Sequence, residues 1–335
     1  MKVVTQASTH AGRTVSCAAM TEATVAFIDI CDAAARIAPH AHVTPMLRSR
    51  RLDALAGAEL FFKAEHLQRI GAFKFRGACN AVWRLDAATA AHGVVTHSSG
   101  NHGAALALAA QTRGIAAHVV VPQGAVKSKL IAIEGYGAQL HHCAATITAR
   151  ESMAEQVRLA TGAHLVHPYT DPDVIAGQGT ATLELLQQSG GLDVLIAPVG
   201  GGGLISGSAI AARALNPAIE VYAAEPEGAP DAYESFRRGA RYTDITPNTI
   251  ADGLRGTIGV INYALMREYV RDVLPVSDAE IVVAMRLIWH TMKQLIEPSS
   301  ATALAAVLRH REHFVGRRVG LILSGGNVDI DNLPW

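Results

Sequence analysis

The sequence predicts an α/β fold in which mostly parallel sheets are covered by helices on both faces. Short runs of β-branched residues alternate along the chain with Ala- and Leu-rich stretches of helical length. The strand-like runs are apolar throughout, as in VLIAPV at 194–199, which is typical of strands buried on both faces. Three glycine-rich turns directly follow such runs. Because ligands in open α/β sheets bind beyond the carboxyl ends of the strands, we expect these turns to meet in one cleft.

Each expected element rests on its local composition. Strands are expected at 94–96, 117–121, 139–143, 194–199, 221–224 and 319–323, and helices at 104–112, 126–134 and 204–215. Pro168 and Pro172 bracket a short polar segment, which predicts that the chain crosses between two lobes there.

Composition excludes several classes of protein. Lysine plus arginine equals aspartate plus glutamate at 29 each, so neither nucleic acid nor an anionic membrane is expected as the main partner. The longest apolar runs have the length of a strand, not of a membrane span. The widely spaced Cys17, Cys31, Cys79 and Cys143 form no CxxC pair, which favours a reduced, cytoplasmic protein. Residues 1–20 lack a signal-peptide core and are expected to be a loosely ordered extension.

The turn GGGG at 200–203 is a candidate phosphate site. It lies between an expected strand and an expected helix, where glycines let the backbone approach a ligand and a helix N-terminus favours an anion. It lacks the ending of a nucleoside-triphosphate loop and the GxGxxG spacing of a dinucleotide site. A tight turn without a ligand is the alternative from these residues alone.

Lys74, in GAFKFRGA at 71–78, is a candidate amine nucleophile. Phe73 and Phe75 would partly bury it and Arg76 adds a neighbouring cation, and both effects lower the pKa of a lysine. The local sequence equally allows the phenylalanines to pack in the core while Lys74 extends to solvent.

Two further turns carry neutral hydrogen-bonding groups. SSGNHG at 98–103 places hydroxyls, an amide and an imidazole ahead of a helix, which suits a carboxylate. Capping of that helix by Ser98 or Asn101 is the alternative. SGGN at 324–327 follows the last expected strand and, in isolation, is an ordinary turn.

Glu225 and Asp231 follow an expected strand around Pro226 and Pro230. This arrangement is compatible with a site for a hard divalent cation and equally with solvated loop carboxylates. The fifteen histidines show no HExxH or similar ligand spacing, so they predict no other metal site.

In their order along the chain, these motifs resemble those of the fold type II pyridoxal-phosphate enzymes. The set comprises 71–78, 98–103, VIAGQGT at 174–180, 200–203, EPS at 297–299 and 324–327. It is similar to the serine/threonine dehydratase branch, which includes serine racemase and threo-3-hydroxyaspartate ammonia-lyase, from about residue 22 to the end. The resemblance implies two open, twisted, mostly parallel sheets. It also implies a large cofactor-binding domain at 1–92 and 172–335 and a small mobile domain at 93–171.

The resemblance further implies a role for each candidate residue. Lys74 would form a Schiff base with pyridoxal 5'-phosphate and act in catalysis, with Ser99 as the acid or base on the opposite face. The other cofactor-binding residues would be Phe73, Asn101, Gly200, Gly201, Gly202, Gly203, Leu204 and Ser324. The substrate carboxylate would be bound by Ser98, Ser99, Asn101, His102 and Arg150. A divalent cation (Mg, Ca or Mn) would be held by Glu225, the Ala229 carbonyl and Asp231.

The implied activity is that of a dehydratase (ammonia-lyase), which converts a 3-hydroxy amino acid such as L-serine or L-threonine to a 2-oxo acid and ammonia, in a cytoplasmic homodimer. The alternatives are a threo-3-hydroxyaspartate ammonia-lyase, a serine racemase with side dehydratase activity, and a non-catalytic binding protein for the cofactor or an amino acid. Ala72 stands where many family members have serine, which weakens an assignment to simple threonine dehydratase. A neutral Ser324 beside the pyridine nitrogen favours prompt elimination over transamination.

Overall fold

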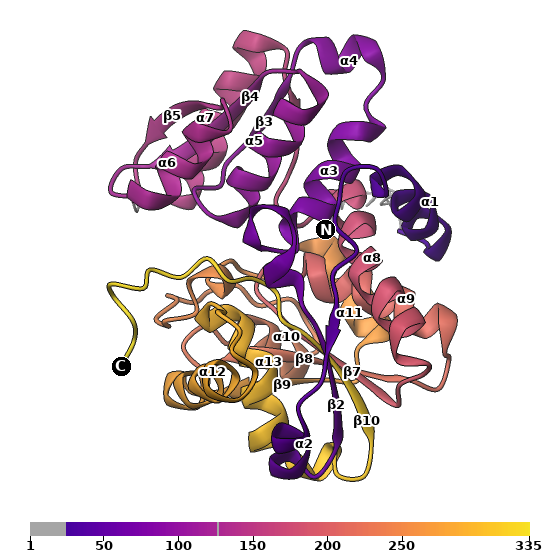
Figure 1. Ribbon diagram of the computed structural model, residues 1–335. Helices are drawn as coiled ribbons and strands as arrows, with labels where there is room; N and C mark the ends of the chain where they lie inside the picture. The colour runs from indigo at the N-terminus through magenta and orange to yellow at the C-terminus, as the bar shows by residue number, and fades with distance from the viewer. Residues whose placement is uncertain (1–24, 126) are drawn as a thin grey trace, which may run out of the picture.

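The computed structural model describes residues 25–125 and 127–335 and contains two sheets (Figure 1). In this described part, the larger sheet has the strand order β1-β2-β10-β7-β8-β9 and the smaller one β5-β4-β3-β6. Every pair is parallel except β1 with β2. The predicted α/β fold with mostly parallel sheets is therefore confirmed, while the extension expected at 1–20 lies outside the described residues.

All expected strands are present, with small differences at their ends. The larger sheet contains β1 (Met46–Leu47), β2 (Glu59–Lys63), β7 (Val194–Pro198), β8 (Glu220–Pro226), β9 (Asp272–Val276) and β10 (Arg318–Ile322). The smaller sheet contains β3 (Val94–Thr96), β4 (Ala117–Pro122), β5 (Gln139–Cys143) and β6 (His164–Leu165).

Helices cover both sheets. They are α1 (Phe27–Ile37), α2 (Arg50–Ala56), α3 (Lys74–Arg84), α4 (Ala87–Ala91), α5 (Asn101–Arg113), α6 (Lys127–Gly135), α7 (Ile147–Thr161), α8 (Pro172–Ser189), α9 (Gly203–Leu215), α10 (Asp231–Arg238), α11 (Val260–Tyr269), α12 (Asp278–Met292) and α13 (Pro298–Arg309). Short 3-10 turns are η1 (Glu65–Leu67), η2 (Arg69–Gly71), η3 (Asp252–Leu254) and η4 (Arg311–His313). None of the helices in the described ranges is long and apolar enough to cross a membrane.

The uniformly apolar strands reflect burial on both faces. Val194 and Ile196 of β7 pack against α2, α12 and α13, whereas Leu195 and Ala197 pack against α8, α9 and α11 (Figure 1). Successive strand residues point to opposite faces, so a central strand covered on both sides must be apolar at every position. The smaller sheet follows the same rule, with α5 and α6 on one face and α7 on the other.

All strands of the smaller sheet lie between residues 94 and 165, and the chain returns to the larger sheet through α8. The segment from Pro168 to Pro172 is this return. We propose residues 93–171 as the small domain and residues 1–92 and 172–335 as the large one, because these limits keep each sheet within one domain.

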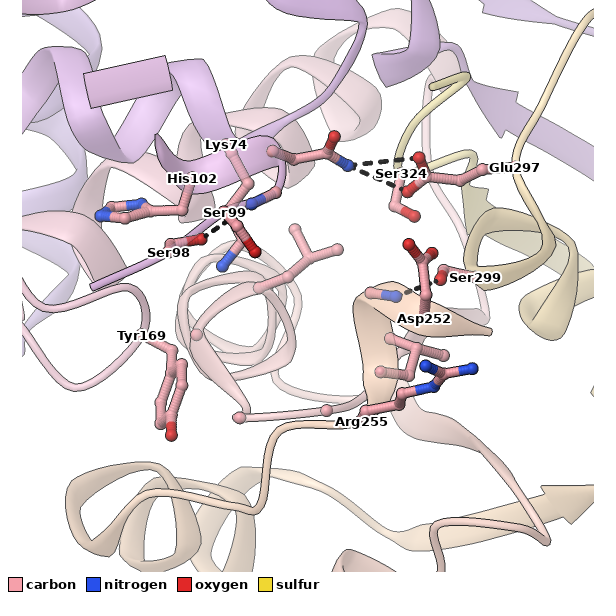
Figure 2. A pocket seen from close by; sticks show the side chains of 18 of the residues that line it. Lys74, Ser98, Ser99, His102, Tyr169, Asp252, Arg255, Glu297, Ser299 and Ser324 are labelled. Atoms are coloured by element: carbon pink, nitrogen blue, oxygen red, sulfur yellow. Dashed lines mark hydrogen bonds between the residues drawn. The ribbon is translucent and has the colours of Figure 1, made fainter. Parts of the chain in front are cut away.

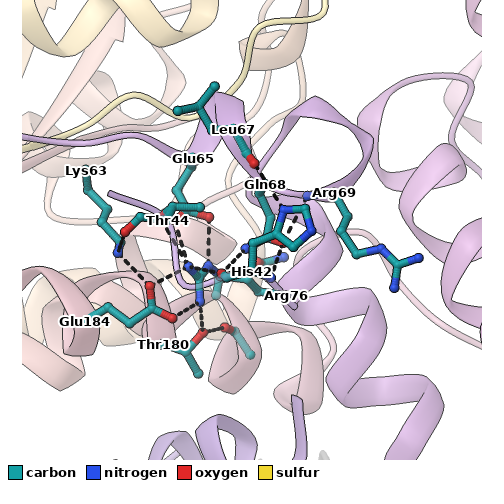
Figure 3. A network of polar contacts seen from close by, with 12 residues as sticks. His42, Thr44, Lys63, Glu65, Leu67, Gln68, Arg69, Arg76, Thr180 and Glu184 are labelled. Atoms are coloured by element: carbon teal, nitrogen blue, oxygen red, sulfur yellow. Dashed lines mark hydrogen bonds and ion pairs between the residues drawn. The ribbon is translucent and has the colours of Figure 1, made fainter. Parts of the chain in front are cut away.

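A buried network of charges anchors the start of α3 (Figure 3). The fully buried Arg76 donates to Glu65 through Nε at 2.7 Å and Nη2 at 2.8 Å. It also donates to Glu184 through Nη1 at 2.7 Å and Nη2 at 2.8 Å. Lys63 completes the network by donating from Nζ to Glu184 at 2.5 Å and to the Thr44 carbonyl at 2.7 Å. The network thus joins α3 to β2, η1 and α8.

Replacement of Arg76 tests the weight of this network. We expect Arg76→Met to lower the free energy of unfolding by about 3–5 kcal/mol, because it leaves the buried Glu65 carboxylate without its cation. Arg158→Ala, which removes an exposed ion pair with Glu155, is the control and should leave the free energy of unfolding nearly unchanged. Urea denaturation followed by circular dichroism measures both values. An equal loss of unfolding free energy in the two variants would contradict a stabilising role for the Arg76 network.

Candidate active site

A cavity of about 440 Å³ is lined by residues from the elements of both sheets (Figure 2). Its walls come from Lys74 at the start of α3, the turn after β3, the glycine turn after β7, and Ser324 after β10. The structure therefore brings the three glycine-rich turns and Lys74 to one place. Each turn reaches it from the carboxyl end of its strand, the edge at which open parallel sheets bind ligands.

The turn at 200–203 has the shape of an anion cradle. Gly202 has a φ of +94° and precedes α9, whose first turn receives no side-chain cap, so its N–H groups stay free. A Cβ on Gly201 would lie 2.4 Å from the Tyr169 ring, and one on Gly202 would lie 2.7 Å from Asn262 Cβ. Only glycine fits these positions, and Leu204 follows them in α9.

Lys74 points from the start of α3 into the cavity. Its Nζ donates to the Pro168 carbonyl at 2.8 Å and lies 5.2 Å from the centroid of the Phe73 ring. Burial lowers the pKa of Lys74 to about 8. The expected contribution of Arg76 to this shift is wrong. The two residues are two positions apart on a helix, about 200° around its axis, and Arg76 is neutralised by its own carboxylates.

The turn at 98–103 also leaves a helix N-terminus open. Helix α5 begins at Asn101 after Gly100, with no side-chain cap, so the alternative in which Ser98 or Asn101 caps the helix is wrong. The Ser98 hydroxyl instead accepts the Gly100 N–H at 3.4 Å, and Ser99 lines the cavity. Free N–H groups beside two hydroxyls form a site for a small anion such as a carboxylate.

His102 and Arg150 take different positions around this turn. The His102 ring is buried, its Nε2 lies 3.3 Å from the Val166 carbonyl, and burial, then Lys74, lower its pKa well below the usual range. The ring is therefore neutral, and only its backbone N–H suits an anion. Arg150 of α7 lines the cavity, and its buried Nε has no partner among the described residues.

Ser324 is joined to the Lys74 segment. Its carbonyl accepts the Phe73 N–H at 2.9 Å, and Ala72 forms an isolated β-bridge with Gly325. The Ser324 side chain is buried and lines the cavity. The turn that is ordinary in isolation is thus part of the cavity wall, next to the candidate nucleophile.

Glu297 is a site residue to which the sequence assigned no role. Its oxygens accept from Asn101 Nδ2 at 3.1 and 3.2 Å, drawn as dashed lines to Glu297 in Figure 2. In turn, Asn101 Oδ1 accepts from Asn327 Nδ2 at 2.9 Å. Burial, with the nearby Asp252, raises the pKa of Glu297 to about 7. The signal for it was a carboxylate directly before the proline and small residues that begin an apolar helix.

Four more charged or aromatic lining residues were missed. Lys129 of the small domain forms an ion pair with Asp252 of the large domain, at the cavity edge. Arg255 is held by the Thr249 carbonyl through Nε and Nη2, at 3.1 and 2.6 Å. Tyr169 packs against the glycine turn. None of these residues belongs to a motif, so only the fold could bring them to the site.

The carboxylates Glu225 and Asp231 lie together outside the cavity and are both buried, so the reading as solvated loop residues is wrong. Glu225 accepts the N–H groups of Ala232 and Tyr233, each at 2.8 Å. Burial, then Asp231, raises the pKa of Glu225 well above its usual range, and burial raises that of Asp231 to about 6. Asp231 Oδ1 has no partner in the described part of the chain. With the buried turn at Ala229, this donor set fits a hard cation.

Comparison with known proteins decides the family. The family model described as pyridoxal-phosphate dependent enzyme matches residues 37–325. The chain belongs to this family of enzymes. It is 49% identical to the serine racemase of Dictyostelium discoideum, over 93% of this chain and 97% of that protein. It is 48% identical to the beta-hydroxyaspartate dehydratase of Paracoccus denitrificans, over 92% and 98%. Among solved structures, maize serine racemase matches with a TM-score of 0.90 and 45% identity, over 92% and 95% of the two chains.

The family cofactor, pyridoxal phosphate, fits the donor groups of the cavity. It needs an amine for its aldehyde, a phosphate cradle, and a partner for its ring nitrogen. Lys74, the turn at 200–203 and Ser324 offer these groups in one cavity.

Substitution in the glycine turn tests this fit. We expect Gly201→Ala to weaken pyridoxal-phosphate binding at least about tenfold, because its Cβ would overlap the Tyr169 ring at 2.4 Å. Gly135→Ala, at a helical position with open space, is the control. Fluorescence titration of the cofactor-free chain with pyridoxal phosphate measures both affinities. Unchanged affinity in Gly201→Ala would show that the phosphate lies elsewhere.

The raised pKa of Glu297 predicts a pH-dependent stability. The folded chain binds a proton on the Glu297 carboxyl more tightly than the unfolded chain does. The stabilisation that this proton provides is therefore present below pH 4.5 and is lost as the pH rises to about 7. Over this range, we expect the wild-type cofactor-free chain to lose roughly 3 kcal/mol more stability than Glu297→Gln. Urea denaturation at several pH values measures this, with the exposed Glu312→Gln as control. Parallel pH curves for wild type and Glu297→Gln would contradict it.

Proposed function

We propose that the protein eliminates water from a 3-hydroxy amino acid such as L-serine or L-threonine, giving a 2-oxo acid and ammonia. The observation that carries this proposal is the Lys74 amine, whose pKa is lowered to about 8, in the same cavity as an uncapped helix start and a neutral Ser324. Relatives named as a racemase and a dehydratase of hydroxy amino acids support it.

The cofactor would be held by this chain's own groups. The N–H groups at 200–203 and Leu204 would bind its phosphate, Phe73 would pack on its ring, Asn101 would contact its ring hydroxyl, and Ser324 would bond its ring nitrogen. When bound, the group draws off the negative charge that develops at Cα. A serine hydroxyl does not keep the ring nitrogen protonated as a carboxylate would, which favours rapid loss of the β-hydroxyl over transamination.

The substrate carboxylate would be bound at the open start of α5. The N–H groups and hydroxyls of Ser98, Ser99, Asn101 and His102 suit it, and Arg150 supplies the opposite charge from α7. Held there, the substrate presents Cα to Lys74. The Lys74 amine takes the Cα proton as general base, the electron pair left on Cα expels the hydroxyl, and the hydroxyl leaves as water with a proton from the Lys74 ammonium. The unsaturated amine that results takes up one water molecule to give the 2-oxo acid and ammonia.

A second candidate is threo-3-hydroxyaspartate as the substrate. Beyond Arg150, the cavity contains Lys129 and Arg255, two cations that suit a second carboxylate. The similarity to a beta-hydroxyaspartate dehydratase supports this candidate. Serine racemisation is the remaining alternative, and Ser99 would then exchange the proton on the face opposite Lys74.

The proposal also includes a cation site, a homodimer and a cytoplasmic location. The pair Glu225 and Asp231, with the Ala229 carbonyl, would hold Mg, Ca or Mn, and the orphaned Asp231 Oδ1 supports this. A homodimer and a cytoplasmic location are proposed by analogy with the family. The balanced charge is compatible with both.

An assay of 2-oxo acid release tests the function. The panel contains both enantiomers of serine and threonine and threo-3-hydroxyaspartate, each with and without EDTA. We expect release from at least one of them, loss of release in Lys74→Ala, and weaker release with EDTA. Preference for hydroxyaspartate would select the second candidate, and enantiomer exchange without release would select racemisation. No turnover of any member would contradict the proposed function.

A further inference from the structure

The segment 167–170, which leads from β6 to α8, passes between Lys74 and the glycine turn. His167 organises it. Its Nδ1 accepts the backbone N–H of Tyr169 at 3.3 Å and of Thr170 at 3.1 Å. The ring must therefore carry no proton on Nδ1, and the two bonds close a tight turn around Pro168.

This turn serves both sides of the cavity. On one side, it directs the Pro168 carbonyl at Lys74 Nζ, 2.8 Å away. On the other, it seats the Tyr169 ring against Gly201 and the Tyr169 backbone against Gly203, while the Tyr169 carbonyl accepts Asn262 Nδ2 at 2.9 Å. One side chain thus fixes both the acceptor for the amine and a wall of the phosphate cradle.

We propose that His167 is a positioning residue for Lys74. Its Nδ1 holds the turn so that the Pro168 carbonyl receives the Lys74 amine whenever that amine is free. The proposal rests on the role of Lys74 as base in the proposed function. After proton transfer, the proton sits on Nζ and the C–H electron pair stays with the substrate, so the new ammonium needs an acceptor in a buried site. The Pro168 carbonyl provides it.

The surroundings keep His167 in the acceptor state. The His97 and Tyr169 rings pack edge-on against the His167 ring, with centroid distances of 5.0 and 4.6 Å. Lys74 faces the His167 ring from α3. His102 of α5 lies in the same group, and Arg150 and Glu151 of α7 face His97. Burial, then His97 and Lys74, lower the pKa of His167 to about 3. His167 is thus neutral near pH 7.

Two substitutions separate this role from packing. His167→Leu removes the acceptor, whereas His167→Asn keeps an oxygen at the same distance from the backbone, able to accept the same two N–H groups. In the holoenzyme, we expect His167→Leu to lower kcat about 10–100-fold with little change in KM, because the base is misplaced. His167→Asn should stay within about threefold of wild type. If His167→Leu does not fold, His167→Ala takes its place.

A second measurement does not depend on any substrate. The pH profile of acetylation at Lys74 is followed by peptide mass spectrometry on the full-length, cofactor-free chain. In His167→Leu the midpoint should fall below the wild-type value of about 8, because this variant loses the carbonyl partner of the Lys74 ammonium. In His167→Asn the midpoint should stay at the wild-type value, because the carbonyl keeps its place. This shift without any turnover would support the His167 role while the proposed function fails. The proposal would be overturned if His167→Leu had the same midpoint as wild type. It would also be overturned if His167→Asn shifted the midpoint as much as His167→Leu.

Discussion

A buried guanidinium needs carboxylate partners beside it, and the arrangement of this site depends on the partners of Arg76. Its fork reaches Glu65 and Glu184, and Lys63 balances the second carboxylate. These groups come from β2, η1, α3 and α8, so the start of α3 has one position that satisfies all of them (Figure 3). Lys74 lies on the opposite side of the same helical turn, which places its amine in the cavity rather than in the network.

The rest of the site is built at the edges of two sheets. The larger sheet contributes the glycine turn and Ser324, and the smaller one contributes the open start of α5. Residues of both domains meet in pairs, Asn101 with Glu297 and Lys129 with Asp252. The segment 167–170 connects the two sheets and contacts Lys74 through the Pro168 carbonyl, and His167 holds its turn. The fold thereby positions uncharged donors, one amine of lowered pKa and the cations Lys129, Arg150 and Arg255 around a small space.

The sequence predicted the elements and the motifs because their causes are local. A strand buried on both faces is apolar, as at β7, and a turn residue with a positive φ is usually glycine, as at Gly202. Features that depend on distant partners were not predictable. Tyr169 and Glu297 acquire their roles from residues far along the chain. The effect of Arg76 on Lys74 was misjudged because neighbours in sequence point apart on a helix, and burial of the Glu225 pair depends on how its turn packs.

The central claim is that the Arg76 network holds the Lys74 end of α3 in place. Hydrogen exchange of the Arg76→Lys variant, read by mass spectrometry, tests it most directly, because a lysine keeps the charge but cannot reach both carboxylates with a fork. The account predicts faster exchange confined to 72–84 and the contacting part of α8, with α12 as protected as in wild type. Unchanged protection at 72–84, or an equal loss across all helices, would contradict it.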